Sequence, residues 1–222
     1  MFRNYLSVSL RNIRQSPLYA FINIFSLAIG LSASTVIYLF IKDERSFDSF
    51  HGKNSVIYRL DEIQNFTGTN LQKVALSMPG MAPNLQADFP EVINYTRYWS
   101  HDQTLFKLGE KQVLIDQVKA VDSTFLDVFD FPLVAGNFST ALDEPHTVLL
   151  TEETALKLFN TAEAAMGNMV TLVDEEFKVT GILANTPENS HLQFDALISI
   201  NTFTRRNPGF NNQWGSNFLN TY

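Results

Sequence analysis

The side chains that most often carry catalysis or bind metals are few and scattered in this chain. Its four histidines, His51, His101, His146 and His191, lie far apart in the sequence, and the chain has no cysteine. A zinc site recognisable from sequence needs histidine or cysteine at short spacing, as in His-Glu-x-x-His, and no such spacing occurs. The residues therefore predict no catalytic, cofactor-binding or metal site.

Two acidic groups offer weaker chemistry. The run Asp174–Glu176 could hold calcium, but three consecutive acids are more typical of a solvated hairpin turn. Asp43, Glu44 and Asp48 follow a long apolar stretch and fit a helix end and surface charges better than an acid–base pair. The sequence also has neither the glycine-rich phosphate loop with Lys-Ser/Thr nor the Gly-x-Ser-x-Gly nucleophile turn. The chain is therefore expected to be no enzyme and to need no cofactor.

The stretch Leu18–Ile41 is the longest apolar run and holds no charged side chain over 24 residues. A helix of this length extends about 36 Å, enough to cross a hydrocarbon core of about 30 Å. The sequence therefore predicts a transmembrane helix over residues 17–41, surrounded by membrane lipid. A cleaved signal peptide is the alternative, with Ser32-Ala33-Ser34 as the cleavage site. Its apolar core would be only about 7–15 residues long, whereas apolar residues continue to Ile41.

The charges on either side of this helix indicate its direction. Arg3, Arg11 and Arg14 precede it without any acidic residue, and basic residues concentrate on the cytoplasmic side of a membrane. We therefore expect a cytoplasmic N-terminus and an outer domain over residues 42–222. Three of the 16 basic residues precede Lys42, so the rest carries 13 basic and 23 acidic side chains, a net charge of −10. Such an acidic domain argues against nucleic acid as a partner.

Residues 1–16 have the pattern of a cytoplasmic amphipathic helix lying at the inner membrane surface. Apolar side chains recur at helical spacing on one face, namely Phe2, Leu6, Leu10 and Ile13. The three arginines fall on another face, where they would meet anionic headgroups. Ser16 is expected to cap the next helix, with Pro17 at its first position. One continuous helix kinked at Pro17 is the alternative.

Small or polar residues form a stripe along the apolar helix. Asn23, Ser26, Gly30 and Ser34 are spaced by three, four and four residues, which places them on one side. Small residues at this spacing let another helix approach closely, and Asn23 could donate or accept a hydrogen bond across the interface. The stripe predicts packing against helices of a dimer or a partner, although a chance arrangement is the alternative.

The outer domain has an α+β pattern, because strand-like and helix-like segments mix without regular βαβ alternation. Thr151 and Thr154 form a capping pair for one helix, and Asp122 or Ser123 is expected to cap another. Without cysteine, the domain must rely on its core rather than on disulfides. The expected strands are 55–64, 71–77, 92–99, 104–108, 112–120, 147–150, 169–173, 177–184 and 194–200, and the expected helices are 79–88, 123–129 and 151–159.

Three longer stretches carry a family resemblance. The first combines residues 5–14 and 21–31 with Asp43-Glu44-Arg45-Ser46-Phe47-Asp48-Ser49-Phe50-His51 and Ile57-Tyr58-Arg59-Leu60. The second combines residues 125–136 with 148–151 and 155–159. The third combines residues 177–183 with Pro187 and Asn189-Ser190-His191-Leu192-Gln193-Phe194-Asp195. With these stretches in this order, the chain resembles the permease subunits of MacB/FtsX-type ABC transporters, especially Bacteroidetes-like ones.

This resemblance implies both a fold and a function. Residues 42–222 would be a MacB-like periplasmic core domain, with a porter-like part beginning near Ser55 and a β-rich insertion over about 123–200. The permease would sit in the inner membrane as a dimer, pair with a cytoplasmic ABC ATPase and a possible periplasmic adaptor, and drive efflux or lipoprotein release. Such permeases have at least three further membrane spans, so the chain is expected to be C-terminally incomplete. A single-pass membrane-tethered periplasmic binding or sensor module is the alternative.

Overall fold

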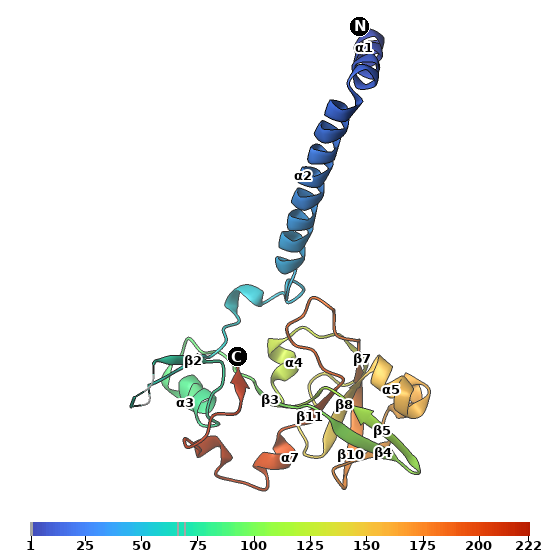
Figure 1. Cartoon of the computed structure of the whole chain (residues 1–222). Coiled ribbons are helices and arrows are strands. Elements are labelled where there is room, and N and C mark those ends of the chain that lie inside the picture. The colour runs from blue at the N-terminus through green and yellow to red at the C-terminus, as the bar shows by residue number, and fades with distance from the viewer. Residues whose placement is uncertain (1, 66, 69) are drawn as a thin grey trace. The chain divides into compact units, whose positions relative to one another are not determined.

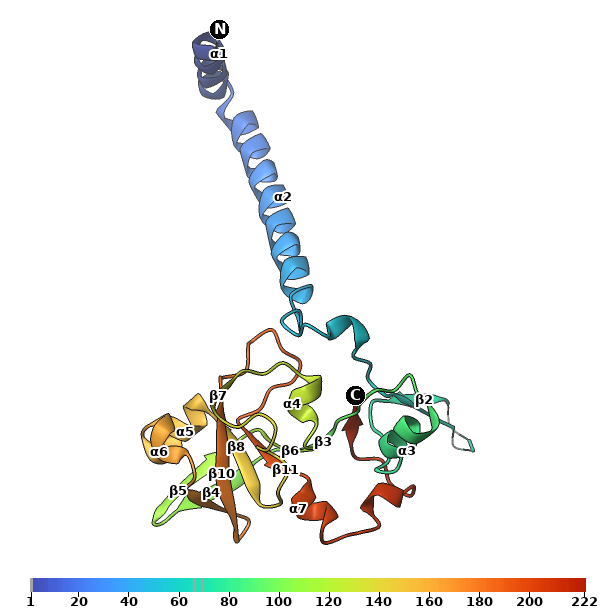
Figure 2. The same ribbon diagram turned by 180° about the vertical axis from the view of Figure 1, so that it is seen from behind.

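The computed structural model describes residues 2–65, 67–68 and 70–222, and only the backbone for residues 2–4, 6, 9, 10 and 12. The chain divides into two compact units, Met1–Phe47 and Asp48–Tyr222. Figure 1 and Figure 2 show the elements of both units from opposite sides.

The first unit consists of two helices. Helix α1 spans Phe2–Gln15 and helix α2 spans Pro17–Glu44, with a bend at Ser16 between them. The predicted helix start at Pro17 is confirmed, and a continuous helix is not observed. The predicted cap at Ser16 is wrong in one respect, because its side chain makes no capping hydrogen bond. A capping hydroxyl accepts from the N–H of the second or third helical residue, and the Ser16 side chain, at a backbone φ of −135° and ψ of 69°, makes no such bond.

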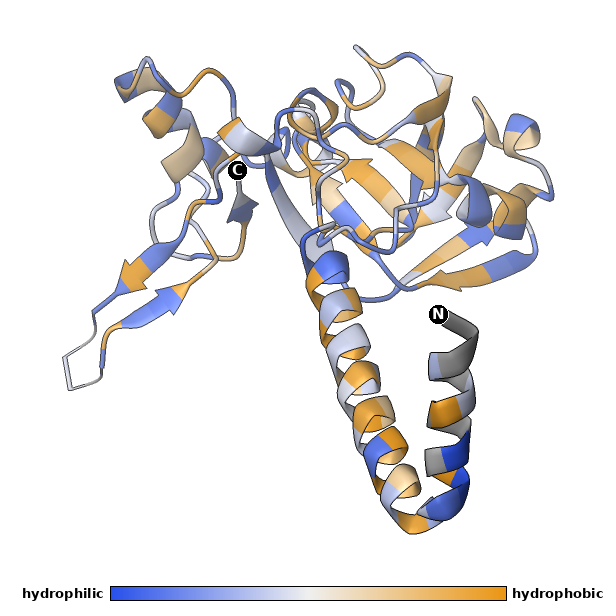
Figure 3. Ribbon diagram, turned by 90° about the horizontal axis from the view of Figure 1, so that it is seen from above, coloured by the Kyte–Doolittle hydropathy of each residue, from blue (hydrophilic) through white to orange (hydrophobic). Residues whose placement is uncertain are grey.

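Helix α2 is long and apolar enough to cross a membrane. It has 28 residues, and its apolar stretch has a mean hydropathy of 2.1. No residue of that stretch is buried within the described structure. Figure 3 shows apolar residues along its length. The helix continues three residues beyond the predicted end at Ile41, through Lys42 to Glu44. Among the described residues it is the one helix that passes this test of length and composition.

The second unit is built on a mixed ten-stranded sheet, which confirms the α+β fold class. The strand order is β12-β3-β6-β11-β8-β10-β9-β4-β5, with β7 also paired to β10. The pairs β8–β10 and β6–β11 are parallel, whereas the other pairs are antiparallel. The strands are β3 Arg97–His101, β4 Thr104–Leu108, β5 Lys111–Ile115, β6 Val118–Val121, β7 Leu133–Gly136, β8 Thr147–Thr151, β9 Met169–Leu172, β10 Glu175–Leu183, β11 Ala196–Ser199 and β12 Asn220–Thr221.

Shorter elements surround this sheet. A separate two-stranded hairpin joins β1 (Glu62–Gln64) to β2 (Gln72–Val74) in antiparallel register. Residues 65–70 between them, whose composition is typical of a turn, include residues 66 and 69, which lie outside the described residues. The remaining elements are helices α3 Met81–Asp88, α4 Phe125–Val128, α5 Glu152–Phe159, α6 Ala162–Ala165 and α7 Asn201–Thr204, and the 3-10 turns η1 Asn54–Val56 and η2 Phe210–Asn212.

The core explains much of the chain's phenylalanine content. One buried cluster lies between the sheet and helices α5 and α6 and includes Phe106, Leu158 and Ile182. A second cluster is aromatic and contains Phe125, Phe129, Phe131 and Phe194. In that cluster the rings of Phe131 and Phe194 meet edge to face at 4.8 Å between centroids, an arrangement that aromatic quadrupoles favour.

Several predicted strands are shorter or divided. The predicted strand over 112–120 is two strands, β5 and β6, which pair with different neighbours. The chain breaks there because Gln117 donates its backbone N–H to the Asp195 carboxylate at 3.1 Å and accepts from the Asp195 N–H at 2.7 Å. The strand over 55–64 becomes η1, an extended segment and β1, and the strand over 92–99 starts only at Arg97.

Two local predictions have opposite outcomes. The capping pair at α5 is confirmed, since Thr151 Oγ1 accepts the Thr154 N–H at 3.3 Å and donates to the Thr154 hydroxyl at 3.0 Å. The cap predicted for α4 is wrong. That helix begins after Thr124 with no side-chain cap, and the Asp122 carboxylate binds Arg97 instead.

The acidic hairpin turn is shifted. Val173 and Asp174 adopt φ values of 47° and 64°, so these two residues form the turn, and Glu175 and Glu176 already belong to β10. Strands from residues 97–121 and 123–200 share one sheet, so the expected boundary near residue 123 does not separate two sheets.

Candidate functional site

The stripe predicted on α2 is exposed along its whole length. Asn23, Ser26, Gly30 and Ser34 are all exposed on this helix. The Ser26 hydroxyl donates to the Ile22 carbonyl oxygen at 2.7 Å, so it is satisfied within its own helix. A role in helix packing stays a prediction.

The predicted membrane-surface arginines lie on α1. Arg11 and Arg14 are exposed there, as a side chain facing lipid headgroups would be. The side chain of Arg3 lies outside the described residues. Contact with the membrane surface stays a prediction.

Two of the four histidines meet at a polar cluster where the outer unit begins. This junction cluster consists of Asp48, His51, Asp130, His191 and Tyr222. His101 and His146 are not part of it. Within the residues that the structure describes, no group of three or more acidic or histidine side chains is arranged to hold a metal ion.

Asp48 is the centre of this cluster. Its carboxylate accepts hydrogen bonds from the His191 backbone N–H at 3.1 Å and from the Ser190 hydroxyl at 3.3 Å, and it lies 2.6 Å from His191 Nδ1. Its own N–H donates to the Asn189 carbonyl at 2.9 Å. Asp48 has a φ of 55°, in the left-handed region where aspartate is one of the tolerated residues. This backbone turn places amide and carboxylate against the same loop.

The contact with Asp48 fixes the proton of His191. An ionised carboxylate accepts the Nδ1–H, so in neutral His191 the Nε2 atom accepts from the Tyr222 hydroxyl at 2.8 Å. Burial raises the pKa of Tyr222, which keeps its hydroxyl protonated. The three side chains form one hydrogen-bonded chain from the start of the outer unit to β12.

His51 binds a different loop. It is buried, and its Nδ1 accepts the Asp130 N–H at 3.0 Å, while the Gly52 N–H donates to the Asp130 carboxylate at 2.7 Å. Burial lowers the pKa of His51, and the remaining proton of the neutral ring is on Nε2. The ring packs against Phe129 and Phe131 at 5.3 and 5.2 Å between centroids.

A cleft of about 400 Å³ opens beside the cluster. Its lining mixes charges of both signs, since Arg59 and Asp61 pair at 2.9 Å next to His191 and Tyr222. Hydrogen bonds of the cluster join four segments of the chain, at residues 48–52, 130, 189–191 and 222.

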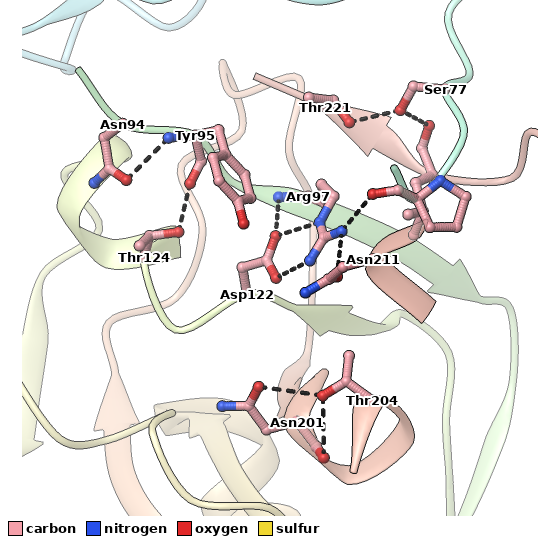
Figure 4. A network of polar contacts seen from close by, with 12 residues as sticks. Ser77, Asn94, Tyr95, Arg97, Asp122, Thr124, Asn201, Thr204, Asn211 and Thr221 are labelled. Carbon is pink, nitrogen blue, oxygen red and sulfur yellow. Dashed lines mark hydrogen bonds and ion pairs between the residues drawn. The ribbon is translucent and has the colours of Figure 1, made fainter. Parts of the chain in front are cut away.

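A second polar network lies in the interior (Figure 4). Arg97 forms a bidentate ion pair with Asp122, with both N–O distances at 2.8 Å, and both residues are buried. The guanidinium also donates to the Pro79 carbonyl at 2.7 Å and to the Asn211 side chain at 2.9 Å. Burial alone would lower the pKa of Arg97, but its bonds to Asp122 raise it overall, so the guanidinium stays charged.

This network joins two strands of the sheet to α3 and η2, which lie outside the sheet. Arg97 is on β3, Asp122 follows β6, Pro79 precedes α3 and Asn211 is in η2. Nearby, the hydroxyls of Ser77 and Thr221 are 2.6 Å apart. A single buried charge pair thus connects the region around α3 to the central strands.

The residues of the two networks differ in whether they fall within the stretches that carry the family resemblance. Asp48, His51, Asp130 and His191 all fall within the three quoted stretches, although nothing in their spacing indicates that they meet. Arg97 and Asp122 lie outside those stretches. The sequence signal for this pair is weak. Arg97 lies within the expected strand 92–99, and Asp122 lies just after the expected strand 112–120.

The family to which this fold belongs is shown by a match of residues 20–220 to the MacB-like periplasmic core domain. The chain belongs to this family. The match begins inside α2 and ends in β12, so it covers most of α2 and nearly all of the outer unit.

Solved structures share this MacB-like fold. A domain of a proposed permease protein from Porphyromonas gingivalis matches with a TM-score of 0.59 and 24% identity, over 67% of this chain and 68% of that one. The periplasmic region of MacB from Actinobacillus actinomycetemcomitans matches with a TM-score of 0.50 and 16% identity, over 72% of this chain and 71% of that one. No curated protein matches the chain significantly. In this MacB-like domain, Asp48 and His51 of the junction cluster lie within seven residues of the end of the apolar helix at Glu44.

Proposed function

We propose that this chain is the N-terminal part of an ABC transporter permease subunit. It would couple ATP hydrolysis by a separate cytoplasmic ATPase to efflux or lipoprotein release in the periplasm. The observation that carries this proposal is the family match over residues 20–220, because it includes a helix long enough to span a membrane together with the outer unit. The chain itself would not be an enzyme.

The arrangement of polar side chains supports a mechanical rather than a chemical role. In both described networks, every charged group is paired with a group from another segment, and the bonds join elements that are far apart in the sequence. Such bonds make a domain stiff, which a part that transmits motion requires.

The proposal includes an orientation in the bacterial inner membrane, with a cytoplasmic N-terminus and the core domain in the periplasm. Because the chain has no cysteine, single thiols can be introduced for labelling. In intact spheroplasts, a membrane-impermeant maleimide should label Lys178→Cys on β10 and leave Gln15→Cys unlabelled until the membrane is opened. Labelling of Gln15→Cys alone would contradict the orientation.

The proposed partners follow from the same assignment. The stripe Asn23, Ser26, Gly30 and Ser34 would pack against helices of a permease dimer, and Arg3, Arg11 and Arg14 would contact lipid headgroups. A periplasmic adaptor would bind the outer unit, and nucleic acid would not.

A purification experiment tests the proposal. The tagged protein is purified from native membranes in mild detergent, and the preparation is tested for an ABC ATPase subunit and for vanadate-sensitive ATP hydrolysis. We expect both, with hydrolysis lost when the phosphate-loop lysine of that ATPase is replaced. A preparation that contains the protein without any ABC ATPase would contradict the proposal and favour a tethered binding module.

A further inference from the structure

The first residues of the outer unit are bonded to segments far along the chain. Asp48 binds the loop at residues 189–191 through its amide and its carboxylate. His51 and Gly52 form a reciprocal pair of bonds with Asp130. The Lys53 ammonium donates to the Asp127 carbonyl at 2.5 Å. Residues 48–53, called here the junction clamp, thus attach to two segments: residues 127–130, at the end of α4 and just after it, and the loop at residues 189–191.

The residues that follow the junction clamp in the sequence belong to a different part of the outer unit. After the clamp, the chain passes through η1 and an extended segment into the β1–β2 hairpin and α3. The Leu60 N–H donates to the Thr221 carbonyl at 2.9 Å, on strand β12 at the edge of the sheet. The chain therefore continues into residues 54–96, while the clamp is fastened to residues 123–200.

We propose that the junction clamp is the point at which movement of α2 enters the outer unit. Displacement of the helix is delivered first to the loops at 127–130 and 189–191, and only then to the covalently adjacent residues 54–96. This inference rests on the proposed function, in which α2 moves during transport. It concerns where the motion enters the domain and which side chains carry it.

The geometry of the clamp suits a load-bearing contact. Asp48 follows the last residue of α2 by only four positions, so the clamp is the first attachment that a displaced helix would load. Its bonds reach two separate segments of the outer unit, and those of Asp48 come first along the chain from α2. The bonds of Asp48 involve a charged acceptor, which makes them stronger than neutral ones. Phe50 and His51 add ring contacts with Phe131 at 5.6 and 5.2 Å.

A pulling experiment on the full chain in detergent micelles tests this inference. Handles are attached at Gln15→Cys and Lys178→Cys, so that force enters through α2 and leaves through β10. While the clamp holds, the outer unit should show no extension before it unfolds. Release of the clamp lets the chain extend as far as the next tether, at Leu60, which adds about 20–40 Å.

Two substitutions at one position separate the clamp from a general loss of structure. His191→Leu removes the imidazole donor, which makes the shortest contact with Asp48, and leaves the donors from the His191 backbone and the Ser190 hydroxyl. We expect the clamp's lifetime under constant force to fall about tenfold or more. His191→Asn keeps an N–H near the place of Nδ1 and should retain most of the lifetime. Asp61→Asn, which breaks an exposed pair beside the same cleft, should change nothing.

The results have clear meanings. An early extension that appears in His191→Leu and not in the other two variants supports the inference. An early extension in the unsubstituted chain, or equal lifetimes for His191→Leu and Asp61→Asn, would overturn it. Asp48→Asn, folded by circular dichroism, must repeat the His191→Leu result. No ATPase is present in this experiment, so its failure is distinct from failure of the purification test.

Discussion

At the residue scale, the molecule depends on a few polar side chains whose partners are remote in the sequence. Arg97 has four hydrogen-bond contacts to Asp122, Pro79 and Asn211 through its side chain, and the rings of Tyr95 and Phe210 lie 5.3 and 5.6 Å from its guanidinium carbon. A buried charge with this many partners tolerates no loss of one of them.

Replacing Asp122 with asparagine should destabilise the outer unit strongly. The change leaves the buried Arg97 charge without its counter-charge, so the free energy of unfolding should fall by about 3–5 kcal/mol. The measurement is urea unfolding of the full chain in micelles, followed by tryptophan fluorescence. Asp61→Asn is the matched control, because its pair with Arg59 is exposed and should contribute less than about 1 kcal/mol. Equal losses in the two variants would refute this account of Arg97.

His51 should make stability depend on pH. Its pKa is lowered by burial below the ordinary value of 6.5, so the unfolded chain binds a proton at a pH where the folded chain does not. The contribution of neutral His51 to the free energy of unfolding should therefore be fully present above about pH 6.5, and it should be lost as the pH drops below that value. Burial lowers the pKa of His101 in the same direction.

Denaturant titrations between pH 7.5 and 5.5 measure this effect. His51→Gln removes the titrating ring and keeps an acceptor for the Asp130 N–H, so it should reduce the slope of stability against pH without abolishing it, because His101 still titrates. An unchanged slope in His51→Gln would show that His51 is not buried in its neutral form.

These residues mark the limit of what the sequence could predict about the site. The four histidines look isolated in the sequence, and no local pattern says that Asp48 and His191 are partners across 143 positions. Asp122 sits where a helix cap is expected, but a buried ion pair with Arg97 stabilises its carboxylate more than a helix N-terminus of one turn would. Tertiary pairing of charges cannot be read from spacing.

At the element scale, prediction succeeds where one local rule decides the structure. The α5 cap depends on Thr151 and Thr154 alone, and the apolar length of α2 decides that helix. Prediction fails where a tertiary contact divides a uniform pattern. Residues 112–120 read as one strand, yet Asp195 binds Gln117 and splits them into β5 and β6. Strand partners likewise depend on residues far away.

The antiparallel pairing of β7 with β10 requires glycine at residue 136. Its φ is 115°, and a Cβ there would lie 2.6 Å from the Thr180 carbonyl oxygen, which is backbone and cannot move aside. Gly136→Ala should therefore lower the free energy of unfolding by about 2–5 kcal/mol through strain and overlap.

Gly109→Ala is the matched control for this strain. Gly109 also has a positive φ, 58°, but nothing lies within 4 Å of the added Cβ, so the loss should be only about 1 kcal/mol. Urea unfolding of both variants measures the difference. Similar losses would mean that the close approach of β7 to β10 at Gly136 does not add to the cost of the substitution.

The stripe on α2 makes a prediction about association. Gly30 has no atom within 4 Å of an added Cβ in the isolated chain, so a large side chain there leaves the helix itself intact. If another helix packs on the stripe, Gly30→Leu should reduce recovery of the permease complex from membranes at least several-fold. Ala28→Leu, on roughly the opposite side of α2, should leave recovery unchanged. Equal recovery of both variants would place the interface elsewhere.

At the scale of the whole molecule, the match to the MacB-like periplasmic core domain covers most of a helix long enough to span a membrane together with nearly all of the outer unit. The α+β class and the family were predictable because composition, element order and quoted motifs extend over most of the chain. The division into porter-like and inserted parts stays a prediction, and strands from both stretches of the chain hydrogen-bond in one sheet. The junction cluster joins the first residues of the outer unit to Asp130 and to the loop at residues 189–191.

The central claim is that ATP-driven motion reaches this domain. The most direct test is amide hydrogen exchange of the purified permease–ATPase complex, compared without nucleotide and after trapping with ATP and vanadate. We predict that exchange changes in the junction clamp, residues 48–53, and in the segments that it binds, residues 127–130 and 189–191. Identical exchange throughout residues 48–222 in the two states, with ATP hydrolysis demonstrably trapped, would contradict the account.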